Sequence, residues 1–202
     1  MPDYVNIIIW GVYALQVVEL IFLPLPSEVS TYRLLSGRSE VTERDALGIK
    51  PFTRGVLILG TVISVITFLI PFVIQLYPDV LIYLLPITVL VELSPALIGV
   101  VLLVLGSLLT LTAVIQISKF RSKNEMPLFT SGIYGFSRNP ITLGLDIIMV
   151  GFFLVYPTWV LLGGTVIYLM NSHYHVVLEE AILRERLGDT YRRYAGNTRR
   201  YL

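Results

Sequence analysis

The stretch PITLGLDIIMVGFFLVYPTWVLLGGTVIYLMNSHYHVVL, which runs from Pro140 to Leu178, decides the fold. It holds two continuous apolar runs, Pro140–Tyr156 and Trp159–Leu178, with a two-residue turn between them. About 20 apolar residues in a helix cross the hydrocarbon core of a bilayer. Only helices and closed barrels satisfy their backbone groups in lipid, and uninterrupted runs favour helices. The stretch therefore predicts two membrane-spanning helices joined as a tight antiparallel hairpin.

Composition extends this interpretation to the whole chain of 202 residues, of which 55% are hydrophobic and only 14% are charged. A soluble domain carries about 25% charged residues. Three further apolar runs have spanning length: Val5–Leu23, Gly55–Tyr77 and Pro95–Ile117. The sequence thus predicts an all-α integral membrane protein with five transmembrane helices. It contains no cysteine, which excludes disulfides, thiolate metal sites and a cysteine nucleophile.

All 15 lysine and arginine residues fall into three segments. These are a loop over about residues 25–54, the connection between the third and fourth spans, and the chain after the fifth span. Five spans place all three segments on one side, which the positive-inside rule makes cytoplasmic. We therefore expect the N-terminus outside and the C-terminus inside. The segment Tyr77–Glu92, interrupted by Pro78 and Pro86, is then an outer-face or partly re-entrant connection.

Two ionisable residues fall within predicted spans, where a charge is costly and often functional. Asp146 lies about 9 Å along its helix from Pro140, at 1.5 Å per residue, and its short side chain does not easily reach the interface. It either lines a cavity or pairs with another span. Glu19 lies near the cytoplasmic end of the first span, where it reaches the interface or pairs with a basic residue such as Arg54.

The inner end of the fifth span is polar, and His175 and Glu179 lie four residues apart on one helix face. Imidazole and carboxylate groups suit zinc or iron, but a third ligand at helical spacing is missing, so no metal site is predicted. This end is either an ordinary interfacial helix end or the wall of a cavity that faces the cytoplasm.

The loop before the fourth span carries a positive charge, opposite to that of the glutamates at the end of the fifth span. Pro140 suits the first turn of a helix, where the free N–H groups attract an anion. Arg138 adds a fork of donors beside this helix end, and Glu179 and Glu180 arrive at the same membrane depth from the fifth span. A ligand that carries both charges and an apolar body fits such an arrangement. An ordinary hairpin with interfacial charges is the alternative.

Beyond the fifth span, an apolar residue recurs at Leu183, Leu187, Tyr191 and Tyr194, with arginines on the other faces. These steps of three and four residues predict an amphipathic helix, which Gly188 interrupts. The helix lies on the membrane surface, where its arginines meet anionic lipid head groups, or packs as a lid under the bundle, or does both.

Two sequence elements flank the hairpin. The first is Gly132-Ile133-Tyr134-Gly135-Phe136-Ser137-Arg138-Asn139-Pro140, followed by Gly144. The second is Glu179-Glu180-x-x-Leu183, then Gly188-x-x-Tyr191-x-x-Tyr194 and Arg199. Together they resemble the two elements that the superfamily of isoprenylcysteine carboxyl methyltransferases and phospholipid methyltransferases carries around such a hairpin. The resemblance covers about residues 128–202, which sets them apart from residues 1–127 with the first three helices and the basic loop.

The resemblance implies a cytoplasmic S-adenosylmethionine site, capped by the C-terminal helix, with S-adenosylhomocysteine as the product. It also implies a lipid-like or prenylated acceptor that enters from the bilayer. The residues expected to bind the methyl donor are Gly132, Tyr134, Arg138, Asn139, Pro140, His175, Glu179 and Glu180. Those expected to take part in the transfer are Arg138, Glu179 and Asp146.

Two positions depart from the superfamily's pattern. Asn139 stands where many members have histidine, which retains donor binding but removes a proton role. Thr142 stands where tyrosine is usual, which removes an aromatic wall beside the acceptor. The acceptor, whether carboxylate, amine or another nucleophile, and the oligomeric state are left open, and no nucleic-acid partner is expected. The other classes considered are an NADPH-dependent membrane reductase of the sterol or steroid type and a non-catalytic membrane protein.

Overall fold

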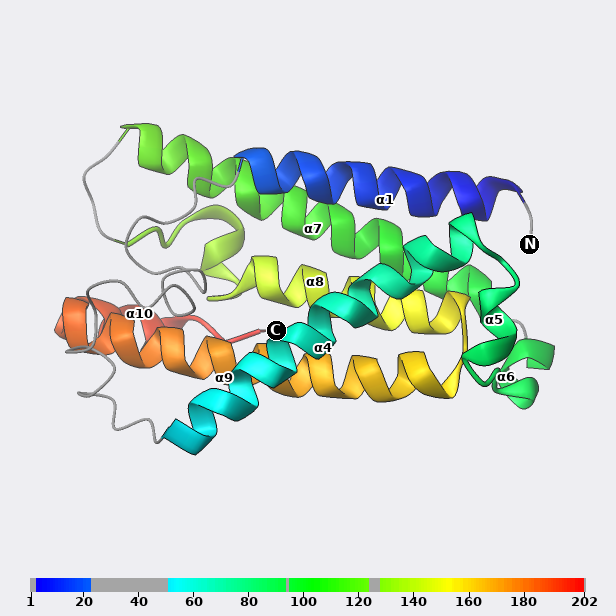
Figure 1. Ribbon diagram of the computed structural model, residues 1–202. Coiled ribbons are helices and arrows are strands. Elements are labelled where there is room, and N and C mark those ends of the chain that lie inside the picture. Colours follow the sequence, from blue (N-terminus) through cyan, green and yellow to red (C-terminus); the bar gives the residue numbers. More distant parts are fainter. Residues whose placement is uncertain (1–2, 23–50, 94, 124–127, 202) are drawn as a thin grey trace.

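The computed structural model describes residues 3–22, 51–93, 95–123 and 128–201, which are helical apart from loops and two isolated β-bridges. The long helices are α1 (Asp3–Phe22), α4 (Pro51–Leu76), α7 (Ala96–Lys123), α8 (Pro140–Val155) and α9 (Trp159–Leu187) (Figure 1). The short ones are α5 (Val80–Tyr83), α6 (Thr88–Leu93), the 3-10 helix η1 (Gly132–Gly135) and α10 (Asp189–Asn197). The all-α fold class is confirmed for this part of the chain. Most of the basic loop lies outside the described residues. The expected pairing of Glu19 involves a side chain that is also outside the described part.

Two described stretches are long and apolar enough to cross a membrane, Gly55–Leu76 in α4 and Ala96–Lys119 in α7. Two shorter apolar helices cover Tyr4–Val18 and Pro140–Val155. The fifth predicted span lies within α9, which continues through its charged end to Leu187. Five spans and their orientation therefore stay predictions.

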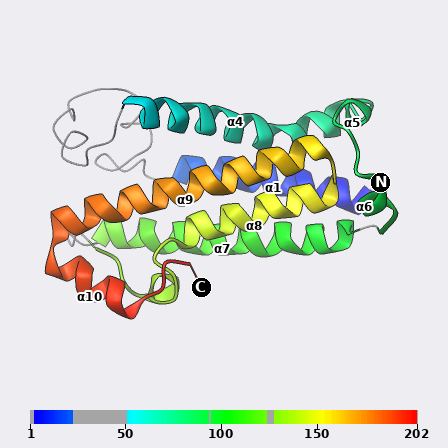
Figure 2. The same ribbon diagram turned by 90° about the horizontal axis from the view of Figure 1, so that it is seen from below.

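The long helices pack against one another as a bundle. α7 and α8 make the most extensive contact, α1 lies on α7, and α9 lies on both α8 and α4. Figure 1 shows α4 running obliquely across the bundle, and Figure 2 shows the other four helices aligned with one another. α8 and α9 are joined by the short turn expected from the sequence, and Thr158 Oγ1 caps α9 by accepting a hydrogen bond from the backbone N–H of Leu161 at 3.1 Å.

Glycine pairs bring the backbones of α7 and α8 together. A Cβ atom placed on Gly106 would lie 2.6 Å from the carbonyl oxygen of Gly144, and one on Gly151 would lie 3.0 Å from that of Gly99. Small residues allow such close approach between membrane helices, where packing rather than hydrophobicity drives association. The α7–α8 contact therefore fixes where α8 begins.

Aromatic rings fill the space between α1, α4 and α8. Tyr13 stacks on Phe152 with ring centroids 5.4 Å apart, and Phe68 meets Phe152 edge-on at 5.8 Å. The hydroxyl of Tyr13 donates a hydrogen bond to the carbonyl oxygen of Phe68 at 2.6 Å, which satisfies its polar end. On the opposite side of α4, apolar side chains such as Leu59 and Ile66 are exposed, as a lipid-facing surface requires.

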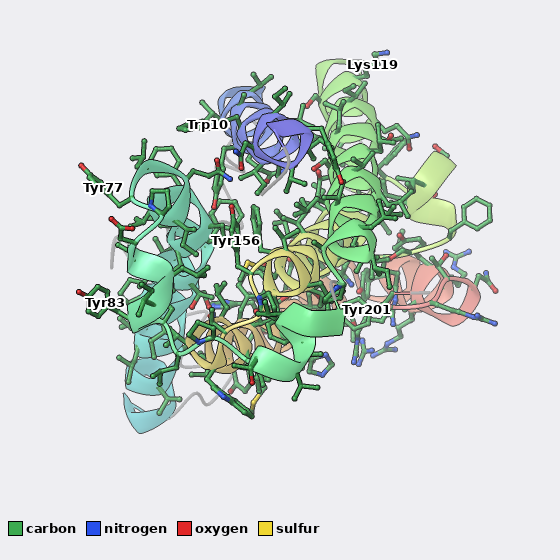
Figure 3. All side chains as sticks on the ribbon, turned by 90° about the vertical axis from the view of Figure 1, so that its right-hand side faces the viewer. Trp10, Tyr77, Tyr83, Lys119, Tyr156 and Tyr201 are labelled. Carbon is green, nitrogen blue, oxygen red and sulfur yellow. The ribbon has the colours of Figure 1, made fainter. Side chains whose placement is uncertain are left out.

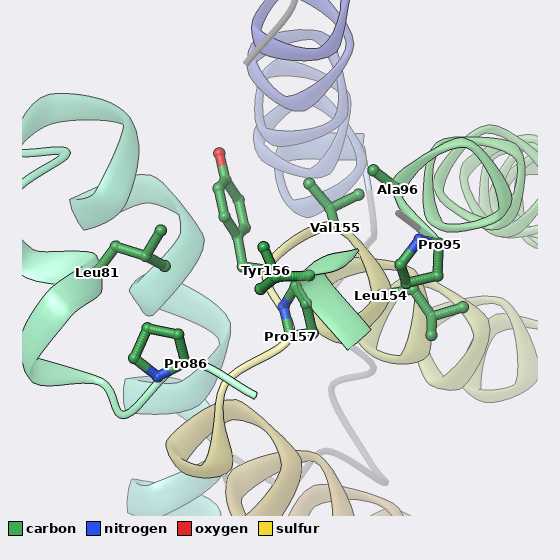
Figure 4. A pocket seen from close by; sticks show the side chains of 9 residues that line it. Leu81, Pro86, Pro95, Ala96, Leu154, Val155, Tyr156 and Pro157 are labelled. Carbon is green, nitrogen blue, oxygen red and sulfur yellow. The ribbon is translucent and has the colours of Figure 1, made fainter. Parts of the chain in front are cut away.

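The segment between α4 and α7 folds against the hairpin turn. The backbone N–H of Ile87 donates to the carbonyl of Pro157 at 2.8 Å, and the N–H of Trp159 donates to that of Leu85 at 3.0 Å. A cavity of about 260 Å³ lies beside this turn, and Figure 4 shows apolar side chains around it. In the end-on view of Figure 3, Tyr77 and Tyr83 project outward. Whether the segment is re-entrant stays open.

The predicted tail helix is divided into two. Gly188, with a φ of 51°, ends α9, and α10 starts at the next residue. Tyr191 and Tyr194 are buried on α10, whereas its arginines are exposed. The left-handed conformation suits glycine, so the break is placed where the sequence has Gly188.

The close α7–α8 contact predicts a specific sensitivity. Gly106→Ala should destabilise the protein by about 1–3 kcal/mol, because the new Cβ meets the backbone of α8, which cannot move aside. Thermal unfolding in detergent measures the effect. Gly163→Ala is the matched control: no atom lies within 4 Å of its Cβ position, so it should be neutral or stabilise by up to about 1 kcal/mol. Equal responses of the two variants would contradict the packing described.

Candidate functional site

The candidate site lies at the end of the bundle where α8 begins and α9 ends. Four further segments lie at this end: η1, the loop that leads into α8, the helix α10, and the residues that follow α10 (Figures 1 and 2). Residues 198–201, called the C-terminal strap below, turn back from α10 beside η1 and α8. The opposite end of the bundle carries α5, α6 and the α8–α9 turn.

Glu180 is the central group of the site. Its side chain is only 3% exposed, and both carboxylate oxygens bind Arg200, whose Nε lies 3.1 Å from Oε1 and whose Nη2 lies 3.0 Å from Oε2. The side-chain amide of Asn139 donates to Oε1 at 3.3 Å. The two-pronged contact is the geometry in which arginine binds a carboxylate most strongly. The hydrogen bonds with the Glu180 carboxylate raise the pKa of Arg200 above its ordinary value.

Two more guanidinium groups approach the same carboxylate. Nη1 of Arg138 lies 3.4 Å from Oε2 of Glu180, and Nη2 of Arg184 lies 3.9 Å from it. Arg138 is nearly as buried as Glu180, whereas Arg184 is more than half exposed. A buried carboxylate needs such pairing to remain charged. Three cations around one described carboxylate leave a local excess of positive charge.

Arg138 also has an unused donor. Its Nε is buried and has no hydrogen-bond partner among the described residues. Buried donors are nearly always paired in folded proteins, so an unpaired one in a charged site points to a missing acceptor. The excess of positive charge around Glu180 favours an anionic acceptor. The residues present therefore fit a ligand that carries a carboxylate or another anion beside a cation.

The start of α8 places Arg138 and Asn139. Pro140 occupies the first turn of α8, as predicted, and Asn139 is the residue that precedes the helix. The side chain of Asn139 makes no capping bond to α8 and instead contacts Glu180 and the carbonyl oxygen of Arg200. The residue before the helix thus serves the site rather than the helix end.

η1 supports this arrangement through contacts with α7 and α10. Gly132 has a φ of 63° and lies against Gln116 of α7, whose Oε1 accepts a hydrogen bond from the N–H of Ile133 at 3.0 Å. The carbonyl of Tyr134 accepts a hydrogen bond from the Tyr194 hydroxyl at 2.7 Å. Burial raises the pKa of Tyr194 to about 12, so this hydroxyl keeps its proton at neutral pH. Gly132 and Tyr134 connect α7 and α10 to the loop that carries Arg138.

The C-terminal strap runs beside the same loop. Arg199 pairs with Ser137 in a parallel β-bridge, and its carbonyl accepts a hydrogen bond from the N–H of Arg138 at 2.9 Å. The carbonyl of Arg200 accepts hydrogen bonds from Ser137 Oγ at 3.3 Å and from the Asn139 side chain at 3.2 Å.

Asp146 lies deeper in α8 and faces α9. Ser172 Oγ donates a hydrogen bond to its carboxylate at 2.8 Å. Tyr201 of the strap is also near: burial, followed by the Asp146 carboxylate, raises its pKa. The hydroxyl of Tyr201 lies 2.9 Å from Nδ1 of His173. Asp146 therefore pairs with a neighbouring helix, at a position that the strap also reaches.

His175 and Glu179 have other surroundings. Nε2 of His175 lies 3.4 Å from the Thr61 hydroxyl of α4, and Glu179 is exposed. The structure thus brings Arg138, Asn139 and Glu180 into direct contact, with Pro140 adjacent and Gly132 and Tyr134 in the supporting loop. The donor-binding roles given to His175 and Glu179 stay predictions.

Sequence reasoning did not single out Arg200. The recognised pattern ended on Arg199, but Arg199 contributes its backbone carbonyl, and the next residue contributes the guanidinium. Ser137 and Ser172 were also missed as partners of the strap and of Asp146. The neighbouring arginines signal that a cation is available, but not which of the two side chains faces Glu180.

Fold and site together define a class: an apolar helical bundle with a buried, charge-paired site at one end. Residues 95–190 match the family model of the phospholipid methyltransferases. The match covers just under half of the chain, from α7 to the start of α10. It confirms the resemblance, seen in the sequence, to the superfamily of isoprenylcysteine carboxyl and phospholipid methyltransferases. No curated protein and no solved structure matches the chain.

Proposed function

We propose that the protein is an integral membrane methyltransferase that uses S-adenosylmethionine and acts on a lipid-like or prenylated acceptor at the cytoplasmic face. The family match implies a methyltransferase of lipid-like molecules. One observation carries the choice of donor: the buried Glu180 carboxylate lies beside Arg138, whose buried Nε has no hydrogen-bond partner in the part of the chain that the structure describes. An amino-acid group, with an ammonium and a carboxylate on one carbon, matches this pair of charges.

The residues divide the binding of that group between them. Glu180 would hold the ammonium, and Arg138, supported by Asn139, would hold the carboxylate. When bound, the donor supplies a methyl group on a sulfonium, whose sulfur–methyl bond breaks as the methyl bonds to the acceptor and the sulfur becomes a neutral thioether. The protein's part is then to orient two reactants and to exclude water.

The need for a base depends on the acceptor. A carboxylate acceptor needs none, whereas an amine has to lose a proton. Glu180 is engaged by three guanidinium groups, and Glu179 is exposed. Asp146 makes no ion pair among the described residues, and its hydrogen bond to Ser172 leaves the carboxylate with acceptor capacity. We assign the acceptor side to Asp146.

The proposed topology has five spans, in α1, α4, α7, α8 and α9, with the N-terminus outside. It is supported by the three basic segments, which five spans place on one side. The candidate site and the exposed arginines of α10 share the end of the bundle that carries the start of α8, so this topology makes them cytoplasmic.

Single cysteines test this topology without background labelling, because the chain contains no cysteine. Tyr83 of α5 and Arg193 of α10 are both exposed. In intact cells, Tyr83→Cys should react with a membrane-impermeant maleimide, and Arg193→Cys should react only after lysis. Labelling of both variants from the same side would rule out five spans with these orientations.

Donor binding is tested by thermal unfolding of the purified protein. S-adenosylhomocysteine should stabilise the wild type, by about 2.7 kcal/mol at a concentration 100 times its Kd. Glu180→Gln should lose this response, because the amide carries no charge to hold an ammonium. Glu185→Gln, on the exposed part of the same helix, is the matched control and should respond like the wild type.

The other outcomes identify the competing classes. Stabilisation by NADPH instead of S-adenosylhomocysteine would contradict the methyltransferase and favour the reductase. No response to either compound would favour a non-catalytic membrane protein. A Glu180→Gln variant that still binds S-adenosylhomocysteine, while remaining folded, would show that the donor site is elsewhere.

The acceptor side is tested by Asp146→Asn. This variant should keep its stabilisation by S-adenosylhomocysteine but lose about 10²–10⁴-fold in methyl transfer to membrane lipids, which is the typical contribution of a positioned proton acceptor. Transfer of radiolabelled methyl groups measures the loss. Ser172→Ala, which removes only the hydrogen bond to Asp146, should have a smaller effect. Unchanged transfer by Asp146→Asn would return Asp146 to a structural role.

A further inference from the structure

Arg200 makes hydrogen bonds with two residues of the proposed donor site, Glu180 and Asn139. Its guanidinium binds the carboxylate of Glu180 through two of its three nitrogens, Nε at 3.1 Å and Nη2 at 3.0 Å. Its backbone carbonyl accepts a hydrogen bond from the side chain of Asn139 at 3.2 Å. A single residue thus presents a cation to Glu180 and an oxygen acceptor to Asn139.

The amino-acid end of S-adenosylmethionine carries the same two kinds of group, an ammonium and a carboxylate. We infer that Arg200 is a built-in competitor for the donor site, and that the C-terminal strap has to leave Glu180 before the donor binds. This inference rests on the proposed function. It goes beyond the family match, because residues 198–201 lie outside the matched region, which ends at residue 190.

Burial distinguishes the partner that can leave from the one that stays. The side chain of Arg200 is 33% exposed, whereas that of Arg138 is 10% exposed. When Arg200 departs, Glu180 keeps Arg138 and Arg184 as ion-pair partners. Opening of the strap therefore does not leave a buried charge without compensation, which would be the main cost of breaking such a pair.

Arg200 makes most of the strap's described hydrogen bonds to the bundle. Beside it, Arg199 forms the β-bridge with Ser137 and accepts a hydrogen bond from the N–H of Arg138, Tyr201 contacts His173 at 2.9 Å, and Thr198 is buried next to α10. His173 is exposed, and Tyr201 is only partly buried. A segment held in this way can dissociate from the site while α10, anchored by the buried Tyr191 and Tyr194, stays in place.

Competition lowers the apparent affinity for the donor by the fraction of molecules in which the strap is open. Arg200→Ala should therefore bind S-adenosylhomocysteine on the order of tenfold more tightly than the wild type, as measured by calorimetric titration of the full-length protein. Arg199→Ala is the matched control. Its affinity should equal that of the wild type, because Arg199 acts through its backbone carbonyl.

A second variant holds the strap closed. Ser137 and Arg199 are bridge partners, and neighbouring strands lie about 4.8 Å apart, within the Cα range that a disulfide spans. In this cysteine-free chain, Ser137→Cys combined with Arg199→Cys gives a single disulfide. The oxidised protein should lose binding of S-adenosylhomocysteine, and reduction should restore it. Each single cysteine variant should bind in both conditions.

The outcomes separate this inference from the proposed function. If the wild type binds S-adenosylhomocysteine but Arg200→Ala binds equally or less tightly, Arg200 is not a competitor, and it supports the donor site instead. Unchanged binding by the oxidised double-cysteine protein would likewise show that the strap need not move. If neither the wild type nor Arg200→Ala binds, the proposed function and the strap inference are both contradicted.

Discussion

A carboxylate buried at the end of an apolar bundle needs positive partners, and Glu180 draws them from three separate parts of the chain. Arg138 comes from the loop before α8, Arg184 from α9 itself, and Arg200 from the strap after α10. Because an unpaired buried charge is strongly destabilising, these parts have to converge on the end of α9. The loop, the C-terminal helix and the strap therefore take their places around this one charge.

Backbone packing in the apolar bundle provides the fixed side of the site. The glycine pairs of α7 and α8 let the two helices approach closely, which fixes the start of α8 and with it Asn139. Gln116, near the same end of α7, holds η1 through the N–H of Ile133. The close α7–α8 contact thus positions the loop that carries Arg138 and Asn139, and the strap packs against this loop.

The family match and the geometry support different parts of the functional argument. The matched region contains Arg138, Asn139 and Glu180, so these three residues lie in the part of the chain that matches the phospholipid methyltransferase model. The proposed donor rests on the charges of Arg138 and Glu180 and on the Nε of Arg138, which has no hydrogen-bond partner among the residues described. The proposed acceptor side rests on Asp146, which lies further along α8 and pairs with Ser172 of α9.

The sequence by itself predicted the helical class, the tight turn between α8 and α9, the resemblance to the methyltransferase superfamily, and Arg138 and Glu180 as site residues. Hydropathy and the positions of Pro140 and Gly188 are local properties that can be read along one dimension. Only the tertiary structure decided that Arg200, not Arg199, faces Glu180, that Asp146 pairs with Ser172, and that His175 faces α4. Helices that are apolar on every side carry little information about their rotation in the bundle, and a chain reversal brings the strap to Glu180. Both depend on contacts between residues far apart in sequence.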